Sequence, residues 1–217
     1  MAHLLVSVLL LCFPKNLNYI SRRSLIGSTI GMSLIRPIAS NANSDEESAL
    51  IRSSKNNLYF SGPMTDNTVF TITANLMALQ QENNINEINL HMQSIGGSLL
   101  PSLGLVDLIR VSDIPINTYV DGYCASAASL ITVVGAQRFI NRYGVILIHQ
   151  LKMGLEPSKY LEIKDQTENA DTLMQLIKEI YLENTNLNNN KLDELLQHDW
   201  WLNSTLCKKY GLVDIII

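Results

Sequence analysis

The sequence predicts an α/β protein built around a largely parallel sheet, and three observations lead to this fold class. Short apolar stretches typical of strands alternate with segments whose apolar residues recur every three or four positions, as on one face of a helix. The connections between these segments are short. Of the 217 residues, 47% are apolar and 17% are charged, which is the composition of a globular protein.

Four elements are expected between residues 58 and 110. They are a strand at 58–62, a helix capped by Thr65 or Asp66, a strand at 88–92 and a helix at 99–110. The first helix follows from four apolar residues that share one face, namely Val69, Ile72, Leu76 and Leu79.

The rest of the chain continues the alternation. The expected elements are a strand at 116–120, a helix at 125–136, strands at 138–141 and 145–149, helices at 160–184 and around 192–196, and a last strand at 213–217. The helix at 125–136 is expected to be buried, because its residues are nearly all small or apolar. In the long helix, apolar residues such as Leu173 and Ile177 fit a subunit interface and a core-facing stripe equally well.

Charge and cysteine content exclude several classes of protein. The net charge of −4 argues against a general nucleic-acid binder. The three Cys include no CxxC pair and no His/Cys cluster, so we expect neither a disulfide framework nor a zinc site. No segment reaches the roughly 20 apolar residues of a membrane helix.

Residues 1–44 differ from the body of the chain in charge. They contain no acidic residue and four basic ones, Lys15, Arg22, Arg23 and Arg36, whereas acidic residues begin at Asp45. An apolar run at 4–13 precedes the arginines, an order that resembles a signal followed by a transit segment. We therefore expect a cleaved targeting leader at 1–44, a domain at 45–217 and a plastid destination, with the mitochondrion as the alternative.

Three places in the pattern can carry chemistry. Gly96 and Gly97 follow a strand, where the backbone can turn with positive φ and present N–H groups to an oxyanion. Ser126 lies at the expected start of a helix, where small neighbours leave its hydroxyl accessible and the helix N-terminus favours negative charge. His149 closes a buried strand, at the sheet edge where α/β active sites gather. Taken singly, each also fits an ordinary turn, helix cap or core histidine.

Five segments, in order, resemble ClpP, the family of proteolytic subunits of the Clp protease. They are Leu58–Gly62, Ser94–Ser98, Gly122–Ala128, Ile146–Gln150 and Tyr210–Asp214, and together they extend the resemblance over about residues 50–217. The resemblance implies the ClpP/crotonase-like fold, an α/β repeated ββα superhelix with a protruding helical handle near 160–184. It also implies a serine endopeptidase that cleaves unfolded polypeptides inside a ring chamber, without a metal or an organic cofactor.

The functional residues of the family carry over one at a time. The family's G-x-A-A-S-M-G segment is GYCASAA here, which makes Ser126 the nucleophile, and its I-H-Q-P makes His149 the base. The family's Asp lies eleven residues before the Tyr of Y-G-L-[IV]-D and corresponds to Asp199, which would orient the imidazole. The backbone N–H groups of Gly96 and Ala127 would form the oxyanion hole, and Gly97 and Ser98 would belong to the substrate loop.

Other residues compete for two of these roles. The rival acids are Asp193 and Glu194, which fit a solvated helix face, and Asp214, which fits a turn. Among the histidines, His91 lies in a strand with one polar face, and His198 is expected to point away from its neighbour Asp199.

The sequence departs from the family in its loops. Ile95 and Leu151 replace two prolines of the family, and the stretch 152–157 has one Gly where the family has several. In the family this stretch pairs two rings, and a longer N-terminal segment forms the gate that contacts the ATPase. The resemblance implies stacked heptameric rings, by self-association or as mixed ClpP/ClpR rings, with a Clp ATPase as a possible partner. It implies no nucleic-acid or membrane partner.

Two other functions fit the same fold. One is a non-catalytic ClpR-like ring subunit, against which the intact Ser, His and Asp argue. The other is a crotonase-like acyl-CoA enzyme, in which paired N–H groups hold a thioester enolate and no pairing of Ser126 with His149 is needed.

Overall fold

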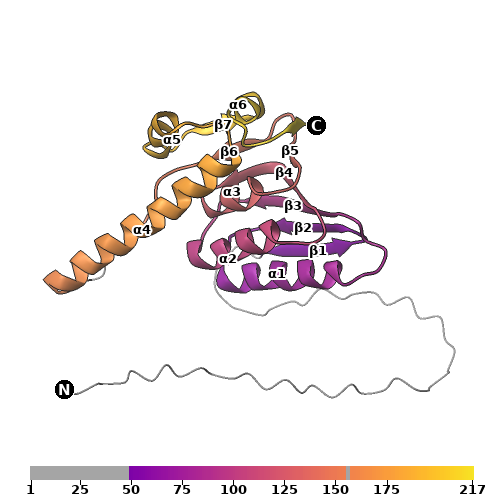
Figure 1. The fold of residues 1–217 in the computed structure, drawn as a ribbon, viewed down its shortest axis with the longest axis horizontal. Helices are drawn as coiled ribbons and strands as arrows, with labels where there is room; N and C mark the ends of the chain where they lie inside the picture. Colours follow the sequence, from indigo (N-terminus) through magenta and orange to yellow (C-terminus); the bar gives the residue numbers. More distant parts are fainter. Residues whose placement is uncertain (1–48, 155–156) are drawn as a thin grey trace, which may run out of the picture. The chain divides into compact units, whose positions relative to one another are not determined.

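The computed structural model describes residues 49–154 and 157–217, in which helices pack against a mixed sheet (Figure 1). The strands are β1 (Leu50–Ser54), β2 (Asn57–Ser61), β3 (Ile88–Ser94), β4 (Ile116–Ala125), β5 (Arg138–Ile140), β6 (Val145–Leu147), β7 (Trp201–Asn203) and β8 (Ile215–Ile216). The helices are α1 (Asp66–Gln80), α2 (Leu99–Arg110), α3 (Ala127–Thr132), α4 (Tyr160–Asn184), α5 (Asn189–Leu196) and α6 (Ser204–Tyr210). The predicted α/β class is confirmed.

The sheet is largely parallel, as the alternation of strands and helices predicts. Its strands follow the order β1-β2-β3-β4-β5-β8, and β6 and β7 extend from β4. Neighbouring strands are parallel except at β1–β2 and β6–β7. The long strand β4 changes partner along its length, because Thr118–Val120 pair with β5 and Tyr123–Ala125 pair with β6. The carboxyl end of β4 therefore lies beside β6.

Helix α1 follows the local sequence rules. The Thr65 side chain accepts from the Thr68 N–H at 3.2 Å, and Thr68 Oγ1 accepts from the Thr65 N–H at 2.8 Å, which completes a reciprocal cap. The buried side chains of α1 are the four predicted ones, Val69, Ile72, Leu76 and Leu79. Each contributes about 1.5–3 kcal/mol by leaving water, so this face fixes α1 on the sheet.

Helix α3 is shorter than the predicted helix at 125–136. Ala125 still belongs to β4, where it pairs with Leu147, and the positive φ of Ser126 is incompatible with a helical residue. Near the other end, the hydroxyl of Thr118 donates to the carbonyl of Thr132 at 2.6 Å. Neither constraint follows from local composition, because both come from neighbouring strands. The expected burial is confirmed, since all residues of α3 are buried.

Three elements, β1, β7 and α6, are absent from the sequence prediction. Strand β1 has mostly exposed residues and lacks the alternation that indicates a strand. Strand β7 spans three residues, and α6 starts directly after it with Asn203 as its cap, accepting from the Leu206 N–H at 2.9 Å. Such short elements give too few residues to establish a period.

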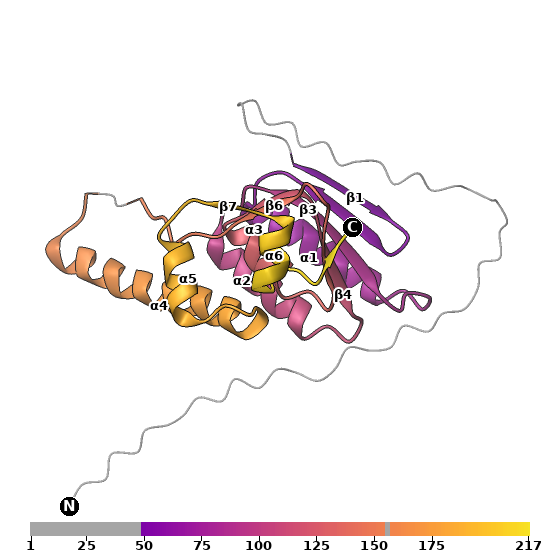
Figure 2. The same ribbon diagram turned by 90° about the horizontal axis from the view of Figure 1, so that it is seen from above.

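Helix α4 has two different halves. Its buried residues, Ile177, Ile180 and Tyr181, lie in the C-terminal half, so the core-facing interpretation of the apolar stripe is confirmed there. In the first turn, Tyr160 is 80% exposed and Leu161 is 67% exposed. Figures 1 and 2 both show the N-terminal part of α4 extending away from the sheet, as expected of a helical handle.

The predicted leader at 1–44 lies outside the described residues, so its cleavage and its destination stay predictions. Within the described ranges, no helix combines the length and apolar character needed to cross a lipid bilayer.

Candidate active site

Three strands form one row of the sheet close to the predicted catalytic residues. Ala125 of β4 pairs with Leu147 of β6, and Leu147 pairs with Trp201 of β7. Strands β4 and β6 run in the same direction, whereas β7 runs against them. The residues that follow Ala125 and Leu147 and the residues that precede Trp201 therefore lie at the same edge of the sheet.

All three predicted triad residues lie one or two positions beyond this row. Ser126 directly follows Ala125, His149 is two residues after Leu147, and Asp199 is two residues before Trp201.

Two backbone hydrogen bonds tie these three segments together. The Ser126 N–H donates to the Leu147 carbonyl at 3.0 Å, and the Gln150 N–H donates to the Leu196 carbonyl at 2.8 Å. The backbone thus brings the three segments to one place, although their residues lie up to 73 positions apart in the sequence.

Ser126 has an unusual backbone conformation. Its φ is +56° and its ψ is −129°, at the position where β4 turns into α3. Among the non-glycine residues that the structure describes, only Lys55 shares a positive φ. Such a conformation costs on the order of 1–3 kcal/mol for a residue with a Cβ, and it clusters at functional sites where the surroundings enforce it.

Gly96 packs directly against Ser126. A Cβ on Gly96 would lie 2.5 Å from the Ala125 carbonyl oxygen, 2.7 Å from Ser126 Cβ and 3.0 Å from the Ala127 nitrogen. Its φ of +89° also favours glycine. The glycine loop and the start of α3 are therefore in contact, as the prediction of a shared oxyanion hole requires.

The backbone amides of this loop are not equivalent. The Gly96 N–H donates to the buried Ser94 Oγ at 3.1 Å, so this donor is engaged. The Gly97 N–H and the Ala127 N–H have no acceptor within the part of the chain that the structure describes. Ser98, also predicted to lie in the substrate loop, donates its N–H to the Met64 carbonyl at 2.7 Å, which anchors the loop.

The half-buried His149 contacts a neighbouring backbone carbonyl. Its Nδ1 lies 2.5 Å from the Gln150 carbonyl oxygen. Because a carbonyl only accepts, this hydrogen bond assigns a proton to Nδ1. Within the described residues, no hydrogen bond joins His149 to Ser126 or to Asp199. The structure thus brings the segments together without forming the triad's hydrogen bonds, and the triad stays a prediction.

The nearby rival groups are engaged in other contacts, whereas Asp199 is exposed and has no ion pair among the described residues. Asp193 pairs with Lys178 at 2.6 Å, and Glu194 pairs with Lys191 at 2.8 Å. His198 stacks on Trp200 with ring centroids 4.0 Å apart.

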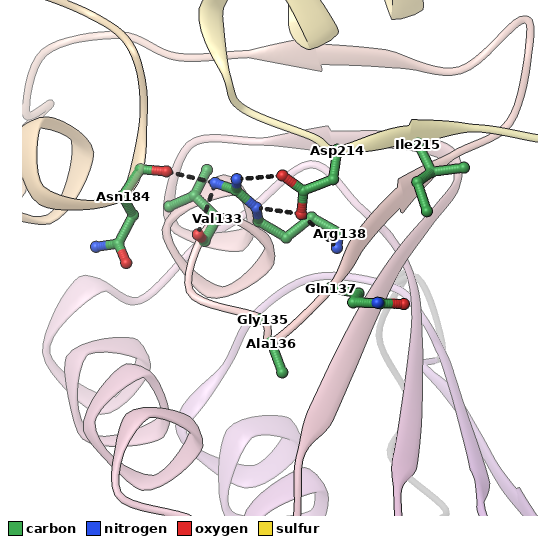
Figure 3. A pocket seen from close by; sticks show the side chains of 8 residues that line it. All are labelled: Val133, Gly135, Ala136, Gln137, Arg138, Asn184, Asp214 and Ile215. Carbon is green, nitrogen blue, oxygen red and sulfur yellow. Dashed lines mark hydrogen bonds and ion pairs between the residues drawn. The ribbon is translucent and has the colours of Figure 1, made fainter.

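The third rival acid, Asp214, belongs to a structural cluster around Arg138 (Figure 3). Its carboxylate accepts from Arg138 Nε at 2.9 Å and from Arg138 Nη2 at 2.5 Å. The same guanidinium donates to the backbone carbonyls of Val133, Asn184 and Gly211. Arg138 thereby fastens β5 to the last residue of α4 and to the chain after α6. Its hydrogen bonds hold the pKa of Asp214 below its ordinary value.

This cluster predicts a pH-dependent stability effect for Asp214→Asn. Because the folded-state pKa of Asp214 is lowered, its contribution is complete above the unfolded value of about 3.9 and is lost as the pH falls through the folded value. We expect a lower Tm than wild type at pH 7 and convergence of the two Tm values as the pH falls below the folded-state pKa of Asp214. A Tm difference that persists unchanged in acid would contradict the assignment.

His91 is occupied in a ladder across the sheet. Its Nδ1 lies 3.0 Å from Asp121 Oδ1, and its ring stacks between Tyr59 and Tyr119 at centroid distances of 4.4 and 4.3 Å. In the register of β3 with β4, His91 faces Tyr119, whereas Ser94 faces Cys124 next to the site. His91 therefore lies well before the edge where Ser126 is found.

The two described cysteines are poor nucleophiles. Cys124 and Cys207 are both buried, and burial raises the pKa of the Cys124 thiol strongly and that of Cys207 to about 12. Both thiols stay protonated near neutral pH. No cluster of three or more His, Cys, Asp or Glu in the described ranges could hold a metal ion.

Sequence reasoning missed two residues that contact the site. Ser129 in α3 donates to the Ser126 carbonyl, and Tyr181 in α4 contacts Ser129. The only sequence signal for Tyr181 is its position four residues after Ile177, which places both side chains on one face of the helix.

Residues 40–217 match the family model described as Clp protease. The match covers more than half of the chain and includes every residue of the site. It confirms the resemblance inferred from the five segments, and the mixed α/β sheet is consistent with the ClpP/crotonase fold.

Proposed function

The chain belongs to the Clp protease family, and from this premise we propose that it is a catalytic serine endopeptidase subunit acting on unfolded polypeptides. The observation that carries the proposal is the left-handed φ of Ser126, at a strand-to-helix junction that contacts a glycine loop. His149 and Asp199 each lie two positions beyond the same row of paired residues, and in this proposal they are the base and the orienting acid.

The proposed reaction has two halves. Ser126 Oγ attacks the scissile carbonyl carbon while His149 Nε2 takes the hydroxyl proton. His149 then gives this proton to the departing amine, which leaves an acyl group on Ser126. Water then attacks the acyl carbon while His149 Nε2 takes its proton. The bond from the acyl carbon to Ser126 Oγ breaks, His149 returns the proton to Oγ, and the peptide acid is released. The hydrogen bond of Nδ1 to the Gln150 carbonyl assigns a proton to Nδ1, which fits this role because Nε2 is then the atom that takes the hydroxyl proton.

We propose that the oxyanion donors are the amides of Gly97 and Ala127. The Gly96 amide, favoured by the family pattern, already donates to Ser94 Oγ. Gly96 then contributes through its missing side chain, which lets the loop approach Ala127. Two such donors each contribute roughly 3–4 kcal/mol to transition-state stabilisation.

Activity requires His149 to change partners. Its Nδ1–H has to give up its hydrogen bond to the Gln150 carbonyl and donate to the Asp199 carboxylate instead. Members of the Clp protease family assemble into rings and work with Clp ATPases. We propose that ring assembly, by this chain alone or in a mixed ring, supplies this rearrangement, because the segment after Gln150 belongs to the ring-pairing stretch of the family. A plastid destination, with the mitochondrion as the alternative, is a separate proposal that rests on residues 1–44.

A fluorophosphonate probe tests the proposed function. We expect the full-length chain to be labelled covalently, with mass spectrometry locating the adduct on Ser126, because only an activated serine attacks the probe. Absence of labelling in assembled rings, alone and with added family subunits, would favour the non-catalytic ClpR-like subunit. Turnover of an acyl-CoA without peptide cleavage would favour the crotonase-like enzyme, which the family match does not support.

A further inference from the structure

A chain of two buried hydroxyl groups connects α4 to the backbone of Ser126. Tyr181 OH lies 2.7 Å from Ser129 Oγ, and Ser129 Oγ lies 2.6 Å from the Ser126 carbonyl oxygen. Tyr181 is 1% exposed and Ser129 is fully buried. The proposed mechanism uses neither side chain.

The direction of both hydrogen bonds follows from the acceptors. The Ser126 carbonyl only accepts, so the single hydroxyl proton of Ser129 is donated to it. The Tyr181 hydroxyl must then donate to Ser129 Oγ. Burial raises the pKa of Tyr181, which keeps its proton in place. Donors aligned in this way polarise and strengthen one another.

The two-hydroxyl chain ends at Ser126, the residue with the strained backbone. The Ser126 carbonyl also accepts the Ser129 N–H at 2.9 Å, which closes the first turn of α3. On its other side, Ser126 is held by the bond of its N–H to Leu147. A strained conformation persists only where surrounding contacts enforce it, and the hydroxyl chain acts directly on the peptide group that follows the strained φ.

We propose that Ser129 and Tyr181 are positioning residues that hold the backbone of Ser126 in its reactive orientation. This inference rests on the proposed function of Ser126. It links the nucleophile to α4, the helix whose first turn is exposed and extends from the sheet. A change in the position of α4 would therefore alter the backbone of Ser126 through Tyr181 and Ser129.

The test is a double-mutant cycle with Ser129→Ala and Tyr181→Phe. Two quantities are measured for the wild type and for each variant: the second-order rate constant of fluorophosphonate labelling at Ser126, and the Tm. We expect labelling to be about tenfold slower in Ser129→Ala, because small displacements of a reacting group carry large rate penalties. Tyr181→Phe should be about threefold slower, since Ser129 still donates. The double variant should match Ser129→Ala within about twofold, because both residues act through one bond.

Comparison of Tm with rate separates positioning from a purely structural role. Ser129→Ala leaves the buried Tyr181 hydroxyl without a partner, which lowers the Tm. The double variant removes that hydroxyl, so its Tm should rise again while labelling stays slow. A structural role predicts that labelling per folded molecule stays at the wild-type rate in all three variants, and this result would overturn the inference.

Two matched controls keep the result specific. Thr132→Val removes another buried hydroxyl of α3. This hydroxyl donates to the Ser129 carbonyl and not to the Ser126 carbonyl. Tyr160→Phe removes a tyrosine hydroxyl from the exposed end of α4. Both should label at the wild-type rate. Slowing in the controls equal to that in Ser129→Ala overturns the inference, whereas a wild-type chain without any Ser126 adduct overturns the proposed function as well.

Discussion

Replacement of Ser126 by Ala is expected to lower kcat for peptide hydrolysis by about 10⁴-fold or more and to abolish probe labelling. The hydroxyl is the attacking atom in the proposed mechanism, and no neighbouring group can replace it, because burial raises the pKa of the Cys124 thiol and keeps it protonated. The fold should be retained, since alanine has the same backbone preferences as serine at a positive φ. Hydrolysis of a fluorogenic peptide by the assembled chain provides the measurement.

Ser126→Gly adds a test of the strain. Glycine adopts a φ of +56° without a steric penalty, whereas serine and alanine do not. We therefore expect the Gly variant to be as inactive as the Ala variant but more stable by about 1 kcal/mol in the free energy of unfolding. Ser112→Ala, in the turn after α2, serves as the control and should retain full activity. Peptidase activity in both Ser126 variants would exclude Ser126 as the nucleophile.

Replacement of Gly96 by Ala is expected to lower both stability and activity. The added Cβ would approach the Ala125 carbonyl oxygen to 2.5 Å and Ser126 Cβ to 2.7 Å. Backbone strain at positive φ and steric crowding together should reduce the free energy of unfolding by about 3 kcal/mol. Because the crowded atoms belong to Ser126, the proposed nucleophile, and its neighbours, labelling of the remaining folded molecules should also be lost. Chemical denaturation and probe labelling measure the two effects separately.

Gly104→Ala is the matched control for this substitution. Gly104 lies inside α2 with no atom within 4 Å of the position of an added Cβ. Alanine there should leave labelling unchanged and raise the free energy of unfolding by up to about 1 kcal/mol, through its higher helix propensity. If Gly96→Ala behaved like Gly104→Ala, the close packing of the glycine loop on Ser126 would be wrong.

The elements with a strong period were predictable because their burial is regular. Helix α1 buries the four residues that its spacing selects, and α2 and α4 have the predicted bounds. The prediction at 125–136 was wrong at both ends, since helix propensity is local and the limits of α3 are set by Leu147 and Thr118 on neighbouring strands. Strand β7 could not be predicted, because three residues are too few to show a period and they form a strand only by pairing with β6.

The sequence by itself determined the fold class and family, and its motifs nominated Ser126, His149 and Asp199, because these depend on residue types and their order. The tertiary structure decided how they approach one another: the register of β4, β6 and β7 brings three distant segments to one edge. It also decided which amides are engaged, with the Gly96 N–H on Ser94 Oγ, and joined Tyr181 to the backbone of Ser126 through Ser129. Such contacts depend on positions in space, which no local pattern of residues specifies.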